Sequence, residues 1–135
     1  MITYKQHPQL DFQAVLDLYD SVDWTGYTNR PDMLHQALEH SLFVLAAYDG
    51  DRLVGLLRAV GDGHSIVFIQ DILVLPTYQR QGIGRHLLEQ AIAHFPEIYQ
   101  LHLLTDNTEK IRSFYEAIGF TAVDSLECIT YTYLK

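Results

Sequence analysis

The stretch LVLPTYQRQGIGR, residues 73–85, decides the fold of this chain. An apolar strand runs into Pro76, a polar loop follows, and Gly82 and Gly84 come at the start of a helix with one apolar face. A loop between a strand and a helix start leaves backbone N–H groups without partners, and the positive end of the helix dipole adds to their attraction for anions. The stretch therefore predicts a loop that binds a pyrophosphate.

Two other phosphate-binding motifs share this outline, and the sequence departs from both. A dinucleotide-binding fingerprint needs a third glycine where this chain has Leu87. A P-loop needs Gly-Lys followed by Ser or Thr, which is absent here. A Gly-x-Gly pair alone is also typical of an ordinary turn. The strand before it and the periodic helix after it favour the binding loop.

The pattern on either side of this loop predicts a mixed α/β fold. Its central sheet is largely antiparallel and carries helices on both faces. We expect helices that begin after Asp11, at Pro31, at Ile83 and after Asp106. The expected strands are residues 1–6, 42–48, 52–60, 65–75, 99–105, 120–123 and 128–134.

Composition limits the functional classes. A length of 135 residues predicts one domain, residues 1–135, and the net charge of −8 argues against a nucleic-acid partner. No apolar run is long enough for a membrane span, so we expect no membrane partner. A single cysteine, Cys128, excludes an intrachain disulfide and favours a cytoplasmic location; we expect it to be buried. The seven histidines lack the spacing of metal ligands, so we predict no metal.

Two separated motifs resemble the GNAT superfamily of acetyl-CoA-dependent acyltransferases. Residues 79–84, QRQGIG, match the phosphate loop of that family, Gln/Arg-x-x-Gly-x-Gly/Ala. Asn107, the pair Phe114-Tyr115, and Gly119-Phe120 follow in the order and at the distances of a second family signature. The expected order of strands and helices also resembles the family across nearly the whole chain.

The resemblance implies a fold with splayed central strands and acetyl-CoA as co-substrate. The coenzyme arm would pair with the backbone of the strand before the loop, and the loop amides would hold the pyrophosphate. The residues it assigns to coenzyme binding are Ile72, Leu73, Val74, Gln79, Arg80, Gln81, Gly82, Ile83, Gly84, Arg85, Asn107 and Phe114.

The resemblance also suggests catalytic and acceptor-binding residues. Tyr115 matches the proton donor of the family, although a tyrosine on an apolar helical stripe is also typical of a core. Asp71 is the candidate general base, directly or through water; a structural aspartate fits the pattern equally well. Trp24, Tyr27 and Gln70 are the candidates for acceptor binding, since aromatic faces can hold ammonium groups.

The function implied is acetyl transfer to a primary amine of a small molecule, by direct attack in a ternary complex. Two alternatives stay open. One is an acyltransferase with another acyl chain or acceptor, and the other is a non-catalytic sensor that binds coenzyme A. The apolar C-terminal strands also suggest a homodimer, because edge strands readily pair.

Overall fold

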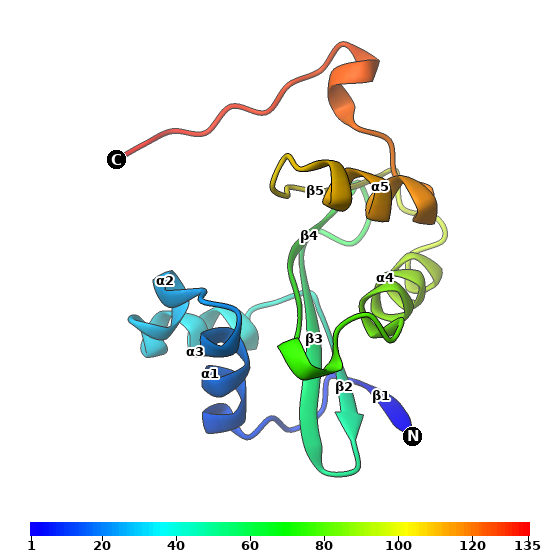
Figure 1. Cartoon of the computed structure of the whole chain (residues 1–135). Coiled ribbons are helices and arrows are strands. Elements are labelled where there is room, and N and C mark those ends of the chain that lie inside the picture. Colours follow the sequence, from blue (N-terminus) through cyan, green and yellow to red (C-terminus); the bar gives the residue numbers. More distant parts are fainter. The chain divides into compact units, whose positions relative to one another are not determined.

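The computed structural model describes residues 1–135, which divide into two compact units, residues 1–104 and 105–135. Each unit is described by itself. The first contains most of the secondary structure (Figure 1). Its elements are β1 (Ile2–Gln6), α1 (Phe12–Ser21), α2 (Thr25–Thr28), α3 (Pro31–Glu39), β2 (Phe43–Asp49), β3 (Arg52–Gly61), β4 (Ile66–Val74), the 3-10 turn η1 (Pro76–Tyr78), α4 (Ile83–His94) and β5 (Gln100–Leu103).

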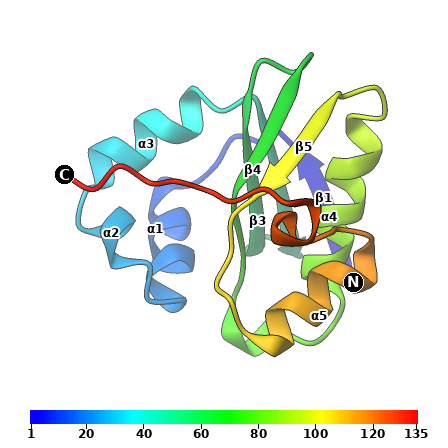
Figure 2. The ribbon, with the colours of Figure 1, turned by 90° about the horizontal axis from the view of Figure 1, so that it is seen from above.

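The sheet has five strands in the order β1-β2-β3-β4-β5. The first four strands pair antiparallel, whereas β4 and β5 pair parallel. The parallel pairing runs only from Ile66 opposite Gln100 to Ile69 opposite Leu103. Figure 2 shows β4 and β5 side by side, and beyond Ile69 the end of β4 has no paired strand on this side, because β5 ends at Leu103. The mixed sheet and the splayed strands are therefore confirmed.

Helices cover both faces of the sheet (Figure 1). The first helices pack on one face because their apolar residues recur at helical spacing. The buried core on that face contains Val15, Leu18, Tyr19, Leu34, Val44, Ala46, Leu53, Leu56 and Leu73. On the other face α4 buries Ile83, Leu87, Leu88 and Ala91. A Cβ added to Gly55 of β3 would lie 3.3 Å from a side-chain carbon of Ile83, so α4 lies close to the strand there.

Helix starts follow the expected signals in this unit. Asp11 is the N-cap of α1, and its carboxylate accepts a hydrogen bond from the Gln13 N–H at 3.0 Å. Pro31 stands in the first turn of α3, where its missing N–H removes no hydrogen bond. The helix α2 was not expected, because Gly26 and Asn29 indicated only a chain break.

The second unit differs from the expectation in two respects. Thr108, not Asp106, caps α5 (Glu109–Ile118), and its hydroxyl accepts from the Ile111 N–H. Gly119 ends the helix at φ 119°, as its position after the apolar stripe predicts. The strands expected at 120–123 and 128–134 are wrong: the only element there is the 3-10 turn η2 (Val123–Leu126).

Cys128 is exposed, which corrects the expectation that it is buried. No helix in the chain has the length and hydropathy that a membrane span requires.

Asp62 organises the turn between β3 and β4. Its carboxylate accepts hydrogen bonds from the backbone N–H groups of His64, Ser65 and Ile66 and from the Ser65 hydroxyl. These donors, the Ser65 hydroxyl first, favour the charged form and lower the pKa of Asp62 from its ordinary value of 3.8.

Asp62→Ala is expected to lower the melting temperature at pH 7 and to matter less in acid. A carboxylate whose pKa is lower in the folded state stabilises above its ordinary pKa, and this contribution is lost as the pH falls through the folded-state value. Melting curves at pH 7 and at pH 2 test this, because the folded-state pKa lies well below the ordinary value and the loss begins only below about pH 4. Asp51→Ala, in the β2–β3 turn, is the control because its side chain accepts no such hydrogen bonds. An equal loss at both pH values would contradict the prediction.

Candidate functional site

The loop between β4 and α4 is fixed at its start. The Tyr78 hydroxyl, from η1, donates to the Asp49 carboxylate at 2.6 Å, and this hydrogen bond raises the pKa of Tyr78. The guanidinium of Arg52 lies over the Tyr78 ring at 5.5 Å. The β2–β3 hairpin therefore holds the first turn of the loop.

The rest of the loop presents backbone donors. Every N–H from Arg80 to Arg85 lacks an acceptor within the protein, and the first helical hydrogen bond at this end joins the His86 N–H to the Gly82 carbonyl. Gly82 is the N-cap of α4 with φ 82°, and a Cβ added there would meet no atom within 4 Å. The surface beside Gly82 is thus open, and it adjoins the positive end of the α4 dipole.

The two loop arginines differ in their surroundings. Arg80 has φ 65°, a left-handed conformation that costs energy for any residue with a Cβ. The Arg85 side chain points along the helix and pairs with Glu89 at 3.3 Å on an exposed face. Arg85 therefore contributes its backbone N–H to the loop, while its guanidinium already has a partner.

The end of β4 beside this loop exposes alternate backbone groups. The Leu75 N–H donates to the Val54 carbonyl of β3 at 2.8 Å. Because backbone groups alternate sides along a strand, those of Leu73 also face β3, whereas those of Ile72 and Val74 face the side that β5 has left. The Gln79 side-chain amide donates to the Val74 carbonyl at 3.0 Å. Only Ile72 and Val74 thus have backbone groups on the open side, and Leu73 does not.

Asp71 lies on the α1 face of the sheet and is buried. The β3–β4 pairing passes from Arg58 opposite Asp71 to Ala59 opposite Ile69, so Gln70 is an extra residue that forms a bulge. Asp71 accepts from Arg58 Nε at 2.8 Å and from the Tyr19 hydroxyl at 2.9 Å through Oδ2. Its Oδ1 accepts from the Tyr27 hydroxyl at 2.9 Å.

This geometry favours the structural alternative for Asp71. Both carboxylate oxygens are already hydrogen-bonded, and an arginine neutralises the charge. Three donors, one of them a charged guanidinium, already bond to the carboxylate, so the arrangement argues against a general base. Asp71 is one half of a buried ion pair, which favours the structural alternative over the expected base.

The residues expected to bind the acceptor lie together. The rings of Trp24 and Tyr27 have centroids 6.4 Å apart, and both make edge-to-face contacts with the buried ring of Tyr19. Burial raises the pKa of the Tyr27 hydroxyl, with Asp71 adding to the rise and a hydrogen bond with Gln70 opposing it. Gln70, exposed on the bulge, thus adjoins Tyr27.

The remaining candidates belong to the second unit. The Asn107 carboxamide oxygen accepts from Arg112 at 3.1 Å, and Asn107 is not the cap of α5. Phe114 is exposed beside Tyr115, with ring centroids 5.1 Å apart. Burial raises the pKa of the Tyr115 hydroxyl, so the group is protonated at neutral pH. The expected roles of Asn107, Phe114 and Tyr115 stay predictions.

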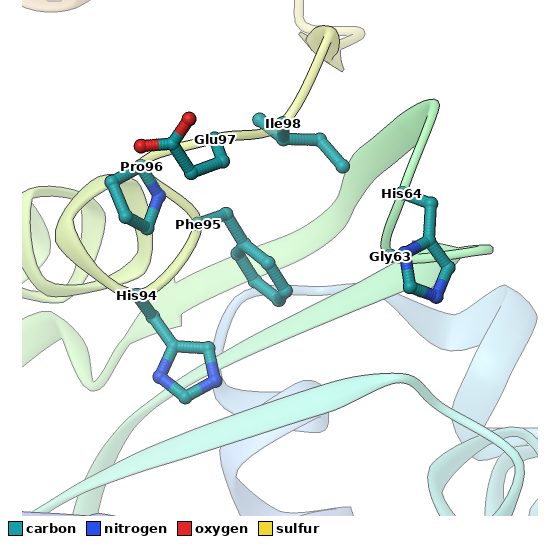
Figure 3. Close-up of a pocket in the computed structure, with 7 residues that line it drawn as sticks. All are labelled: Gly63, His64, His94, Phe95, Pro96, Glu97 and Ile98. Carbon is teal, nitrogen blue, oxygen red and sulfur yellow. The ribbon is translucent and has the colours of Figure 1, made fainter.

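A separate hollow of about 230 Å³ lies at the other end of α4 (Figure 3). His94 and Phe95 line one side of it and His64 the other, with Gly63, Pro96, Glu97 and Ile98 completing the wall. A helix of 12 residues is about 18 Å long, so the hollow is remote from the loop. No group of three or more His, Cys, Asp or Glu side chains is placed to hold a metal ion.

Comparisons with known proteins agree with this arrangement. Residues 9–120 match the model of the acetyltransferase (GNAT) family. The chain belongs to the GNAT acetyltransferase family. The solved structure of a GNAT family acetyltransferase from Streptococcus pneumoniae TIGR4 is similar over 100% of this chain and 98% of its own, with 46% identity and a TM-score of 0.91. The resemblance inferred from the two motifs and the fold class are therefore confirmed.

Curated GNAT relatives are longer proteins. Histone acetyltransferase TAP1 of Glycine max is 32% identical over 122 residues, which cover 80% of this chain and 52% of the relative. Serotonin N-acetyltransferase 2, chloroplastic, of Oryza sativa subsp. japonica is 29% identical over 116 residues, covering 82% of this chain and 56% of the relative. The chain thus spans about half the length of the curated relatives it matches.

The residue that sequence reasoning missed is Arg58. It is the single charge inside an otherwise apolar stretch of β3, and Asp71 is the single charge in β4. Lone opposite charges in two strands joined by a short turn indicate a cross-strand pair. That signal was present in the sequence and predicts the ion pair observed.

Proposed function

We propose that this GNAT chain transfers an acetyl group from acetyl-CoA to a primary amine of a small molecule, by direct attack in a ternary complex. The observation that carries the proposal is the row of unpartnered backbone N–H groups from Arg80 to Arg85 beside the open surface at Gly82. The donors suit a pyrophosphate, and the missing Cβ allows close approach. These residues therefore fit the coenzyme.

The splayed end of β4 supports the same proposal. The backbone groups of Ile72 and Val74 on the open side suit an extended arm that adds a strand to the edge. The Val74 N–H is the proposed donor to the thioester oxygen, on which negative charge develops during attack. Bound acetyl-CoA supplies the activated acetyl group, and the chain supplies orientation and hydrogen bonds.

Proton transfers complete the proposed mechanism. An alkylamine has a pKa of about 10.4, so forming the neutral amine at pH 7 costs about 4–5 kcal/mol. Removal of water from the bound amine would reduce this cost, because desolvation disfavours the charged form. Tyr115, protonated at neutral pH, is the proposed donor to the leaving thiolate. Solvent would accept the proton that the attacking nitrogen releases and would return a proton to Tyr115.

Calorimetry with acetyl-CoA, followed by release of free thiol with a panel of amines, tests the function. The panel contains serotonin, a polyamine and a peptide lysine, since the names of the relatives include serotonin and histone. We expect binding of acetyl-CoA and turnover with at least one small amine. Binding without turnover by any amine or alcohol would instead indicate a coenzyme A sensor, and absence of binding would refute the proposal.

The acceptor kcat/KM is expected to rise about tenfold per pH unit between pH 6 and pH 8, since only the neutral amine attacks and Asp71 is not available as a base. Thiol release at saturating acetyl-CoA measures this dependence. A plateau beginning near pH 6 would contradict it and would indicate a carboxylate or histidine base. Circular dichroism at each pH is the control for folding.

A further inference from the structure

A charged pair is buried where β3 and β4 meet the first helices. The Arg58 and Asp71 side chains are 6% and 3% exposed and lie directly opposite each other in the sheet. Moving both charges out of water costs more than placing apolar side chains there, so such a pair is a poor source of stability. Its presence among apolar neighbours suggests that the pair holds nearby polar side chains in place.

The groups that the pair fixes belong to α1 and α2. Tyr19 and Tyr27 donate to the two oxygens of the Asp71 carboxylate. Arg58 Nη2 donates to the Tyr27 hydroxyl at 3.2 Å, and Nη1 donates to the Ser41 hydroxyl at 3.4 Å. The Tyr27 hydroxyl is therefore held by both members of the pair, whereas the Tyr19 hydroxyl contacts only Asp71.

The same pair lies beside the β4 bulge. Arg58 and Asp71 are the last residues in register before Gln70 interrupts the ladder. The bulge turns Asp71 toward the α1 face, because in a regular ladder, with Gln70 paired in turn, Asp71 would share the face of Ile69. The Tyr27 hydroxyl donates to Asp71, the residue next to the bulged Gln70. The pair thus joins α2 to the point where β4 changes its pairing.

We propose that Arg58 and Asp71 are positioning residues that hold Tyr27 against the β4 bulge and so fix the acceptor side of the transferase site. This inference rests on the proposed function, since Tyr27 and Gln70 are proposed there to contact the acceptor. Arg58 and Asp71 themselves are buried and do not reach it. A fixed Tyr27 ring holds the distance between the Trp24 and Tyr27 rings and the end of β4 constant. The thioester would lie at that end of β4.

Tyr27→Phe and Tyr19→Phe form a matched pair of variants. Each removes one hydroxyl that donates to Asp71, but Tyr19 is fully buried whereas Tyr27 is partly exposed at the acceptor side. We expect Tyr27→Phe to raise the acceptor KM about tenfold, as a lost hydrogen bond to a charged group does. We expect Tyr19→Phe to change the acceptor KM by less than about twofold, although it too lowers the melting temperature.

Two further measurements separate positioning from general damage. The KM for acetyl-CoA is expected to stay within about twofold in both variants, since the loop is untouched. Arg58→Lys retains the charge, but lysine has a single side-chain nitrogen and cannot bond to Asp71 and Tyr27 as arginine does. We therefore expect it to raise the acceptor KM, as Tyr27→Phe does. Melting curves show that each variant is folded.

The outcomes are distinct. Equal acceptor KM values for Tyr27→Phe and wild type, with acetyl-CoA binding and turnover intact, would overturn this inference and leave the proposed function standing. Equal rises in Tyr27→Phe and Tyr19→Phe would also overturn it, because the effect would then be structural only. A wild-type chain that neither binds acetyl-CoA nor turns over would overturn both.

Discussion

Gly82→Val is expected to weaken acetyl-CoA binding by at least about 100-fold while the protein stays folded. The new side chain would project into the open surface beside the loop amides, where no protein atom lies within 4 Å. It would occupy the space that the pyrophosphate needs, so the N–H groups from Arg80 to Arg85 could not all reach it. Calorimetry with acetyl-CoA measures the loss, and circular dichroism verifies the fold.

Gly50→Val is the matched control for this variant. Gly50 also has a positive φ, 60°, and nothing within 4 Å of an added Cβ, but it lies in the β2–β3 turn. Both substitutions carry a similar backbone cost of about 1–3 kcal/mol. We expect Gly50→Val to lower stability and to leave affinity unchanged. Equal affinities in the two variants would show that backbone strain, and not occupation of the loop, explains any loss.

Arg58→Ala is expected to reduce the free energy of unfolding by about 3–5 kcal/mol. The substitution leaves the Asp71 carboxylate buried with only the two tyrosine hydroxyls as partners. Replacing both charges, as in Arg58→Met with Asp71→Leu, should recover only part of the loss, because it removes the unpaired charge but leaves the buried Tyr19 hydroxyl without an acceptor. Urea denaturation of the three proteins at pH 7 provides the comparison.

The exposed Arg85–Glu89 pair supplies the control for this experiment. Its side chains are 52% and 54% exposed, and such a pair is worth less than about 1 kcal/mol. Glu89→Ala should therefore change the free energy of unfolding little. If Arg58→Ala cost no more than Glu89→Ala, the Arg58–Asp71 pair would be too weak to position Tyr27.

Local signals in the sequence predicted most of the first unit. Three helix starts are marked by local properties: the carboxylate of Asp11, the missing N–H of Pro31 and the backbone freedom of Gly82. No distant contact is needed to recognise them. The strand, loop and helix of residues 73–85 are likewise local. The two motifs predicted membership of the GNAT family, and the match to the family model confirmed it.

The role of Asp71 depends on contacts with residues far away in the sequence, so local signals could not predict it. Its direction is set by the bulge at Gln70, and a shift of one residue turns a side chain to the other face of a sheet. Its partners come from three other elements, α1, α2 and β3. Only the lone charge of Arg58 in an apolar strand signalled one of them.

The C-terminal residues show the limit of strand propensity. Residues 128–134 alternate β-branched and aromatic residues with polar ones, which is typical of a strand. A strand forms only where a neighbour supplies backbone partners, and propensity does not identify that neighbour. Ile129, Tyr131 and Tyr133 are exposed in a segment without regular structure.

The most direct test of the account follows backbone amide resonances while coenzyme A is added. The N–H signals of residues 80–85 and of Val74 should shift strongly and saturate together, because these groups are the proposed ligands of the pyrophosphate and of the adjoining arm. Signals from the remote hollow at His94 to Ile98 should move little. Saturable binding that leaves the loop amides unshifted, or no binding at all, would contradict the account.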